Sequence, residues 1–319
     1  WPAWHAAKNT IPIIKMCGTW LRPTDVYPPC CAQRINAYML CRKGVLLMSG
    51  WELSESYDYK GRNIRYGRLG EGPPMVLVHG TPWSSFNLRH LIQQFSREYT
   101  VYFFDLMGYG QSSKDEGDVS LGVQNKVLDC LLDHWELDEP IIVGHDFGGA
   151  TALRTHLLDG RSFKKIILID PVAVSPWGSP FFRHVNAHET AFSGLPDYIH
   201  EAVVRTYVQT AAFKPLDEAT LNGIVLPWTG EEGKAAFYRQ MAQADSKYTD
   251  EAQALYHTIT TPTLILWGRE DSWIPLERGE DLHRMIPDSD LRIVDGAGHL
   301  VIEEKPDELV EEILDFVQA

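Results

Sequence analysis

The stretch "PIIVGHDFGGA" (residues 140–150) places an acidic residue where the chain turns sharply. Its apolar run, 141–143, is typical of a strand that is buried on both faces. Gly144 ends this run, and the segment after the last glycine has the apolar composition of a buried helix. Asp146 therefore lies at a strand-to-helix turn, with Gly144 and Gly148 two residues away on either side. It is either a solvated turn residue or a nucleophile displayed at the end of a central strand.

Similar apolar runs recur along the chain, and most of them end near a glycine or an aspartate. The first two flank the turn "KGRN" and predict a β-hairpin, and helix-like stretches separate the later ones. Strands that alternate with helices predict an α/β fold, a mostly parallel sheet covered on both faces, with its site at the carboxyl ends of the strands. The expected strands are 54–60, 63–68, 74–80, 100–108, 140–146, 164–171, 261–268 and 290–299, and the expected helices include 119–135, 148–159 and 276–286.

The alternation stops in residues 172–259. This region contains Pro-rich turns and several amphipathic segments but no convincing strand. We expect it to be a helical cap inserted into a core that is formed by residues 48–171 and 260–319. A cap of this kind excludes water and shapes a pocket for an apolar substrate.

Residues 1–47 differ from the rest of the chain. They are rich in basic side chains, contain one acidic residue, Asp25, and hold four of the five cysteines. They have neither the apolar core of a secretory signal nor a C-x-x-C pair for zinc. Because Met48 precedes the first strand, we expect residues 1–47 to be an atypical extension outside the native product, with organelle targeting as the alternative. Cys130 is expected to be a small buried residue of a cytoplasmic, reducing-compartment protein.

Composition excludes several classes of partner. The formal net charge of -14 argues against nucleic acid, because phosphate binding needs a basic face. No run reaches the roughly 18 apolar residues of a membrane span. A small apolar organic molecule is the expected partner, and the sequence does not indicate the oligomeric state.

Two further residues follow strands in the order that nucleophilic hydrolases use. Asp271 follows the strand in "TPTLILWG" (261–268), and His299 ends "DLRIVDGAGH" (290–299). The order nucleophile, acid, histidine predicts a catalytic triad of Asp146, Asp271 and His299. Each residue also has an ordinary alternative: Asp271 as a helix N-cap, and His299 as a loop histidine bonded to backbone. Glu270 and Asp170 are alternatives for the acid.

The loop "HGTPWSS" (79–85) follows the third strand and is expected to lie beside Asp146. The backbone N–H groups of Thr81 and Phe147 are then candidates for an oxyanion hole, an interaction typically worth about 3–4 kcal/mol. His79 is expected to hold the loop through side-chain hydrogen bonds. Trp83 either lines the pocket or packs in the core.

From about Ser54 to Ala319 the chain resembles the α/β-hydrolase superfamily, and specifically the branch with an aspartate nucleophile. Epoxide hydrolases, haloalkane dehalogenases and fluoroacetate dehalogenases belong to this branch. The segments "HGTP", "DLMGYGQSS" (105–113), "GHDFGG" and "GAGH" carry the resemblance. A carboxylate can displace a leaving group from a saturated carbon to give an alkyl-enzyme ester, which a water activated by the histidine then hydrolyses. We therefore expect a cofactor-independent hydrolase with an α/β-hydrolase fold.

The resemblance distinguishes the possible leaving groups. Haloalkane dehalogenases hold the halide with a tryptophan directly after the nucleophile and usually an asparagine after His-Gly, where this chain has Phe147 and Thr81. Trp83 and Trp177 are the candidates to replace those donors in the pocket. Fluoroacetate dehalogenases usually have an arginine after the nucleophile, and Phe147 departs from that pattern too.

Epoxide hydrolases protonate the opening ring with cap tyrosines. The segment "AFYRQM" (236–241) resembles one that carries such a tyrosine, so Tyr238 is the candidate cap acid or substrate contact, with packing as the alternative. The first tyrosine of the usual pair has no match in "SPFFRHVNAHE" (179–189). His184 and His188 have a spacing that suits a metal, but no third ligand is evident, so no metal site is expected.

These observations favour epoxide hydrolysis, with haloalkane or haloacid dehalogenation as the alternative. A small-molecule receptor on the same fold is the alternative of another class, which the complete triad and loop disfavour. A serine-type esterase is disfavoured because an aspartate occupies the nucleophile position.

Overall fold

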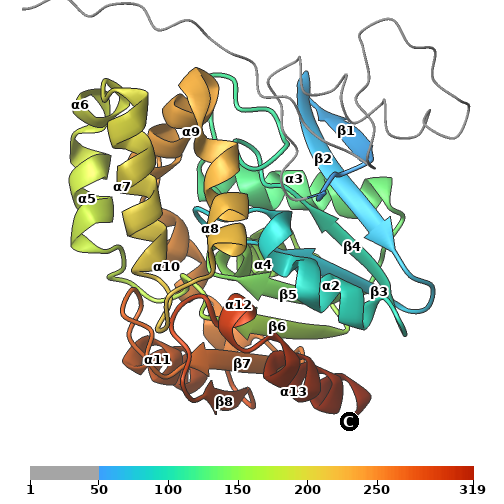
Figure 1. The fold of residues 1–319 in the computed structure, drawn as a ribbon. Helices are drawn as coiled ribbons and strands as arrows, with labels where there is room; N and C mark the ends of the chain where they lie inside the picture. Colours follow the sequence, from blue (N-terminus) through green and yellow to red (C-terminus); the bar gives the residue numbers. More distant parts are fainter. Residues whose placement is uncertain (1–49) are drawn as a thin grey trace, which may run out of the picture. The chain divides into compact units, whose positions relative to one another are not determined.

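The computed structural model describes residues 50–319, which fold around an eight-stranded sheet (Figure 1). The strand order is β1-β2-β4-β3-β5-β6-β7-β8, with β2 antiparallel to both of its neighbours and the remaining pairs parallel. The predicted hairpin and mostly parallel sheet are confirmed, whereas the expectation for residues 1–47 lies outside the described part of the chain. The strands are β1 (Glu55–Tyr59), β2 (Arg62–Leu69), β3 (Pro74–Val78), β4 (Thr100–Phe104), β5 (Ile141–His145), β6 (Lys165–Ile169), β7 (Thr263–Gly268) and β8 (Asp290–Val294).

Helices cover both faces of this sheet. Helices α2 and α13 contact each other in front of the sheet in Figure 1, and α3 and α4 contact each other behind it. Pro306 at the start of α13 and the acidic residues that follow it favour helix initiation, while Leu309, Val310 and Ile313 give the helix one buried face. The core helices are α2 (Arg89–Phe95), α3 (Leu121–His134), α4 (Phe147–Leu158), α11 (Glu277–Met285), α12 (Val301–Glu304) and α13 (Pro306–Gln318), with a 3-10 turn η3 (Ser85–Leu88).

The central strands bring two loops of the predicted site together. The connection after β3 leads to β4 on one side of it, and the next connection leads to β5 on the other side. Such a reversal of strand order opens a crevice at the carboxyl ends of the strands. Val78 at the end of β3 pairs with Gly144 of β5, so the loops that follow these strands start side by side.

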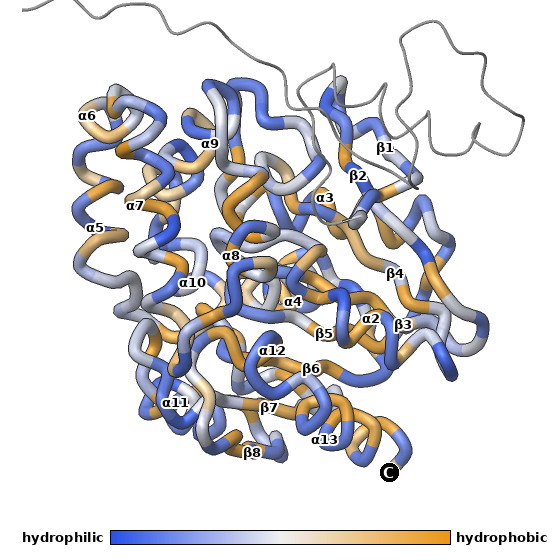
Figure 2. The backbone as a smooth tube through the Cα atoms, viewed as in Figure 1, coloured by the Kyte–Doolittle hydropathy of each residue, from blue (hydrophilic) through white to orange (hydrophobic). Residues whose placement is uncertain are grey.

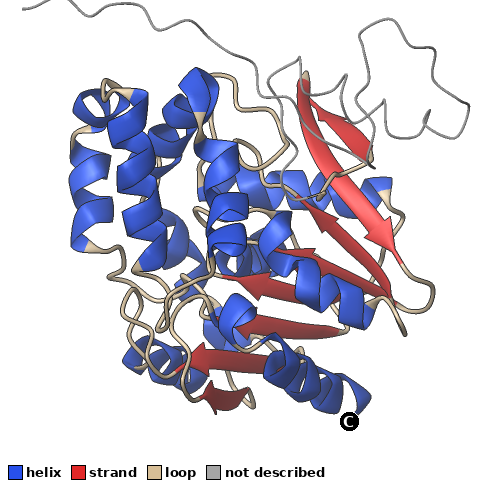
Figure 3. Ribbon diagram, viewed as in Figure 1, coloured by secondary structure: helices blue, strands red, loops and turns tan. Residues whose placement is uncertain are grey.

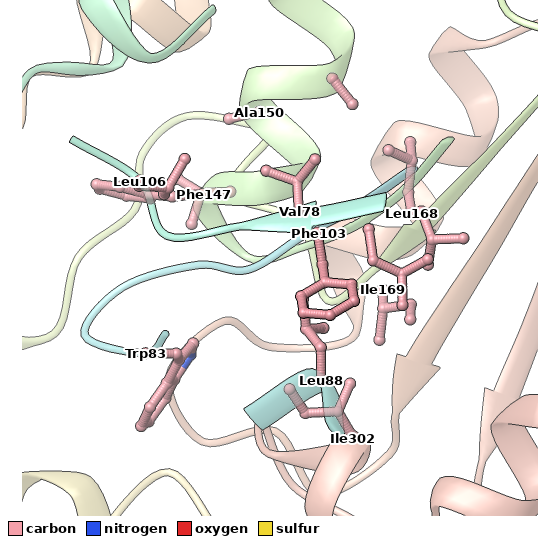
Figure 4. Close-up of a cluster of buried hydrophobic side chains, with 14 of the residues drawn as sticks. Val78, Trp83, Leu88, Phe103, Leu106, Phe147, Ala150, Leu168, Ile169 and Ile302 are labelled. Carbon is pink, nitrogen blue, oxygen red and sulfur yellow. The ribbon is translucent and has the colours of Figure 1, made fainter. Parts of the chain in front are cut away.

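Apolar side chains on both faces explain why these strands form the centre of the sheet. Every residue of β5 and of β7 is buried, and Figure 2 shows the hydrophobic stretches concentrated in the central strands. Figure 4 shows how β3, β6 and α4 meet in this core through Val78, Ile169 and Ala150. Cys130 of α3 is a free thiol that is only partly buried.

A helical segment separates β6 from β7, and Figure 3 shows helices without strands in this region of the described chain. Helix α9 contacts α5, α6 and α7, and α8 packs against α7. No helix within residues 50–319 combines the length and apolar composition that crossing a bilayer requires. The segment contains α5 (Pro180–Ala187), α6 (Glu189–Ser193), α7 (Asp197–Gln209), α8 (Glu218–Val225), α9 (Gly230–Ala242) and α10 (Lys247–Gln253), with the 3-10 turns η4 (Leu226–Trp228) and η5 (Tyr256–Thr258).

Candidate active site

Asp146 lies at the turn between β5 and α4 in a conformation that L-residues rarely adopt. Its φ is 54° and its ψ is -118°, and its side chain is buried. A Cβ atom on Gly148 would lie 2.1 Å from the carbonyl oxygen of Val78, and one on Gly144 would lie 2.5 Å from that of Gly148. The two flanking glycines therefore allow the turn to pack directly against the neighbouring strand and helix.

The two carboxylate oxygens of Asp146 face different partners. The backbone N–H of Thr81 donates to Oδ1 at 2.5 Å, and Nε2 of His299 lies 3.1 Å from Oδ2. Phe147 begins α4 and lines a small cavity that lies over Asp146. Within residues 50–319, however, its N–H makes no hydrogen bond to this carboxylate. Of the two predicted oxyanion donors, Thr81 donates its N–H to the Asp146 carboxylate and Phe147 does not, among residues 50–319.

Asp271 connects to the other side of the His299 ring. Nδ1 of His299 donates to Oδ2 of Asp271 at 2.7 Å. The remaining oxygen, Oδ1, accepts the backbone N–H groups of Trp273 and Ile274, both at 2.8 Å. These bonds fix the carboxylate and hold the imidazole with Nε2 directed at Asp146. The structure thus brings together the three residues of the predicted triad.

The surroundings of His299 favour its charged form. Burial alone would lower the pKa of His299, but the Asp271 carboxylate and then Asp146 outweigh it and hold the pKa well above the usual range. The two carboxyl groups that face the ring therefore favour its protonated form. Removal of the negative charge on Asp146 would lower this pKa and favour the neutral imidazole.

Glu270, one of the alternative acids, has a different partner. Its Oε2 accepts the backbone N–H groups of Gly296 and Ala297 at 2.9 and 3.0 Å. It thereby braces the loop that leads to His299, and it makes no contact with the ring itself among the described residues.

Asp170, the other alternative, lies close to the triad at the end of β6. Its Oδ1 accepts the N–H of Gly268 at 2.9 Å, and burial, followed by the nearby charge of Asp271, raises the pKa of Asp170 well above its usual range. Its Oδ2 and Nδ1 of His145 are buried without a hydrogen-bond partner in residues 50–319. His145, Asp170 and His299 lie within 4.8 Å as potential cation ligands, but both His299 nitrogens face carboxylates. The absence of a metal or cofactor stays a prediction.

The loop after β3, residues 79–85, is tied to the helical segment. The hydroxyls of Thr81 and Tyr109 both donate to Oε1 of Gln240 on α9, at 2.7 and 3.0 Å. The indole N–H of Trp228 donates to the carbonyl of Pro82 at 2.8 Å. The loop that contacts Asp146 is therefore held by residues of the helical segment inserted between β6 and β7.

The same loop is held within the core by His79. Nε2 of His79 accepts the N–H of Leu106 at 2.9 Å, so Nδ1 carries the proton and donates to the carbonyl of Gly80 at 2.8 Å. Burial lowers the pKa of His79, which keeps the ring neutral as this bonding requires. His79 thus joins the loops that follow β3 and β4.

A small cavity of about 30 Å³ lies over Asp146, with room for roughly one or two water molecules. Trp177 lines it as expected, but its indole N–H donates to Oγ1 of Thr249 at 2.9 Å. Trp83 does not line it: its ring is fully buried and stacks behind Trp273 at a centroid distance of 5.6 Å. The lining residues are Thr81, Asp146, Phe147, Val172, Trp177, Gly178, Ser179, Phe182, Tyr207, Trp273 and Ile274.

The structure places Tyr207, and not Tyr238, at this cavity. The Tyr238 hydroxyl donates to Nδ1 of His200 at 2.9 Å, because Nε2 of that ring is bonded to the Trp228 carbonyl. Tyr207 of α7 lines the cavity, and burial raises the pKa of Tyr207 far above neutrality, so its hydroxyl keeps its proton. No motif in the sequence distinguishes Tyr207; its spacing from other apolar residues of α7 predicts only a buried side chain.

The comparisons with known proteins agree with this architecture. The model of the alpha/beta hydrolase family matches residues 75–312, and the chain belongs to this family. A solved alpha/beta hydrolase fold protein from Burkholderia ambifaria is 46% identical, with a TM-score of 0.82 over 83% of this chain and 98% of that one. The fold class is thereby confirmed, and the chain is an α/β hydrolase.

Two curated relatives are more distant. An uncharacterized hydrolase of Bacillus subtilis is 29% identical over 76% of this chain and 89% of its own. Epoxide hydrolase 4 of Mus musculus is 28% identical over 69% of this chain and 66% of its own. These relatives support hydrolysis as the general activity, and they leave the substrate open.

Proposed function

We propose that this hydrolase opens epoxides through an ester between the substrate and Asp146. The observation that carries the proposal is a carboxylate, in place of a hydroxyl, at the turn after β5, with one oxygen on the Thr81 N–H and the other facing His299. A carboxylate attacks a saturated carbon, and its ester can be hydrolysed by the same histidine.

In the first step, Oδ2 of Asp146 attacks an epoxide carbon and the carbon–oxygen bond of the ring breaks. The oxygen that leaves the carbon takes a proton from the Tyr207 hydroxyl, which lines the same cavity and is protonated at neutral pH. Tyr207 replaces Tyr238 as our candidate acid, because the Tyr238 hydroxyl is engaged by His200. The product of this step is a hydroxyalkyl ester of Asp146.

In the second step, His299 takes a proton from water, and the hydroxide attacks the carboxyl carbon of Asp146. The oxyanion that forms on Oδ1 accepts the Thr81 N–H, with the Phe147 N–H as a further candidate donor. Collapse releases a diol and returns the carboxylate, and the proton taken from water leaves His299 in the charged form that it has in the free enzyme. One oxygen of the diol comes from Asp146 in the first turnover.

The charge state of His299 suits this sequence of steps. The carboxylate of Asp146 helps to hold the ring protonated in the free enzyme. Esterification removes that negative charge and lowers the pKa of His299, so the ring passes its proton to the Tyr207 phenolate left by the first step. The Tyr207 hydroxyl is thereby restored, and the neutral base becomes available once the ester is present. The helical segment over the cavity, our proposed cap, keeps bulk water away from both steps.

Dehalogenation is the alternative on the same nucleophile. A halide site needs N–H donors at the cavity, but the Trp177 N–H is used by Thr249 and Trp83 lies behind Trp273. This bonding supports an epoxide as the first substrate class, as does the similarity to epoxide hydrolase 4 of Mus musculus.

The test is intact-protein mass spectrometry of His299→Gln after exposure to panels of epoxides and haloalkanes. Without the base the ester should accumulate, and an adduct with the full mass of the epoxide supports the proposal. An adduct that lacks the elements of hydrogen halide, from the haloalkane panel alone, would transfer the proposal to dehalogenation. The double variant Asp146→Asn/His299→Gln is the control and should form no adduct. No adduct from either panel would overturn the proposal and favour a receptor.

A further inference from the structure

A second, larger cavity adjoins the one over Asp146. The outer cavity has a volume of about 650 Å³ and is open to solvent, whereas the inner one has about 30 Å³. Ser179, Tyr207 and Trp273 line both of them. These three residues therefore form a wall with the proposed reacting groups on one side and an open cleft on the other.

The outer cleft presents an apolar strip to solvent. Ile199, Ala202, Val203 and Thr206 lie three, four and seven residues apart on α7, which places them on one face of the helix. Pro180 and Phe181 of α5 form the facing side, and none of the residues from 50 to 319 that line the cleft is charged. Figure 1 shows α5 and α7 side by side. Hydrocarbon, and not a charged or strongly polar group, is the chemistry that such a strip takes.

The wall between the cavities is a pair of stacked rings. Tyr207 and Trp273 lie with ring centroids 4.4 Å apart and an interplanar angle of 19°. Trp273 also stacks on His299 at 5.3 Å, and Phe181 packs against Tyr207 at 4.8 Å. The wall therefore contacts the proposed base on the inner side and the apolar cleft on the outer side.

The inner cavity is small compared with the outer cleft. Its volume of about 30 Å³ against about 650 Å³ means that an elongated substrate cannot lie wholly within it. A substrate that reaches Asp146 must displace part of the wall, and the adjoining space is the outer cleft. Only the reactive end of a longer molecule would then need to enter the inner cavity.

We propose that the outer cleft binds the hydrocarbon chain of an elongated, uncharged substrate, whose reactive end passes between Tyr207 and Trp273 to Asp146. This inference rests on the proposed function and specifies its substrate class as aliphatic chains with a terminal epoxide. The hydrocarbon chain of the substrate lies along the apolar face of α7, while the terminal carbon of its epoxide faces Oδ2 of Asp146. Each methylene group in the cleft should tighten binding about fourfold.

The test separates binding from turnover by using ligands that lack a leaving group. Primary n-alkanols from butanol to octanol are titrated into the full chain by calorimetry. Affinity for the wild type should rise about fourfold with each methylene group. Ala202→Phe fills the cleft and should weaken octanol binding at least about tenfold with little effect on butanol. Glu201→Phe, at the neighbouring exposed position outside the cleft, is the matched control and should bind octanol like the wild type.

Several outcomes would overturn the inference. A wild-type affinity that does not change with chain length would do so whether or not any variant folds. Equal octanol binding by Ala202→Phe and Glu201→Phe would do so as well. If the wild type binds no alkanol but self-associates, and Ala202→Phe abolishes this self-association, the cleft is instead a contact surface for a second copy of the protein. Chain-length-dependent binding without an adduct on His299→Gln would leave the cleft in place and remove the epoxide chemistry.

Discussion

The two sides of the cavity over Asp146 are held in different ways. On the core side, hydrogen bonds of 2.5–3.1 Å connect Thr81, Asp146, His299 and Asp271. On the side of the helical segment, aromatic rings pack against one another, some of them edge to face, such as Phe182 with Trp177 at 6.0 Å between centroids. Hydrogen bonds fix atoms within tenths of an ångström, whereas edge-to-face contacts tolerate sliding over a wider range.

This difference indicates that the two sides of the cavity have different roles in the proposed reaction. The core side holds groups that exchange protons and bonds, which requires fixed distances. The helical side holds the shape of the cavity, which must adapt when a substrate enters. Substitutions on the core side should therefore reduce the rate of chemistry, and substitutions on the helical side should change which substrates react.

The largest expected effect comes from Asp146→Asn. The amide keeps the size and the Thr81 contact but is not a nucleophile, so turnover should fall on the order of 10⁴-fold or more, with an unchanged fold. The measurement is product formation from the substrate panel, alongside circular dichroism and thermal unfolding. Turnover near the wild-type rate would remove the nucleophile assignment and with it the division between the two sides.

Asp271→Asn should follow, with a loss on the order of 10³–10⁴-fold. An asparagine can donate to Nδ1 of His299, which stabilises the wrong tautomer for a base at Nε2. Single-turnover kinetics should show slower ester breakdown with less change in ester formation. Glu270→Gln is the matched control, because that carboxylate braces the loop at Gly296 and Ala297 instead of the ring. Equal losses in the two variants would mean that the acid assignment is mistaken.

On the helical side, Tyr207→Phe should lower kcat/KM for epoxides on the order of 10²-fold, because the oxygen of the opening epoxide loses its proton donor. Haloalkanes, which leave as halide without a proton, should be unaffected by this change. Tyr238→Phe should keep activity and instead lower the free energy of unfolding by about 1–3 kcal/mol, because Nδ1 of buried His200 loses its partner. The reverse ranking for the two tyrosines would return the role to Tyr238.

The smallest effect concerns the acid stability of the core side. Burial, followed by the charge of His299, lowers the pKa of His145 to about 3, whereas the unfolded chain takes up this proton near 6.5. The unfolded state binds more protons between these values, so the free energy of unfolding decreases as pH falls below 6.5, by about 1.4 kcal/mol per unit. Above pH 6.5 this contribution does not change.

Urea unfolding of the wild type and His145→Gln between pH 7.5 and 5 would check this effect. From pH 6.5 to 5 the free energy of unfolding of the wild type should fall by about 2 kcal/mol relative to that of His145→Gln, because glutamine does not titrate. His299 has the opposite sign, since its raised pKa adds stability below 6.5 that is lost as pH rises, and it is present in both proteins. A difference that does not depend on pH would contradict the prediction.

The residues on the core side of the cavity could be predicted from the sequence more completely than those on the helical side. Buried strands are continuous apolar runs, and the residues at their carboxyl ends must meet at one edge of a parallel sheet. Asp146, Asp271 and His299 each follow such a run, which is why chain order alone could group them. The same five-residue pattern also placed Gly144 and Gly148 on either side of Asp146.

The helical side depends on packing that a periodicity does not encode. Tyr207 and Tyr238 are both buried tyrosines on helices of the inserted segment. Which of them faces the cavity depends on how α7 and α9 are oriented on the core, and on the partner that His200 offers to Tyr238. Trp83 was similarly ambiguous, because a buried aromatic ring can lie one layer behind the cavity wall.

The bonds of Gln240 have a mechanical consequence for the inserted helices. Helix α9 is fastened to the core through Gln240 on Thr81 and Tyr109, and further along through Gln243 Oε1, which accepts the N–H of Val119 at 2.7 Å. A lid that rose as one body would have to break all of these bonds and release the loop that contacts Asp146. A movement that spares these bonds would leave α9 on the core and displace other helices of the inserted segment, such as α5 and α6 at its outer edge (Figure 1). Such a movement would admit a molecule to the cavity while Gln240 continues to hold Thr81 at its distance from Asp146.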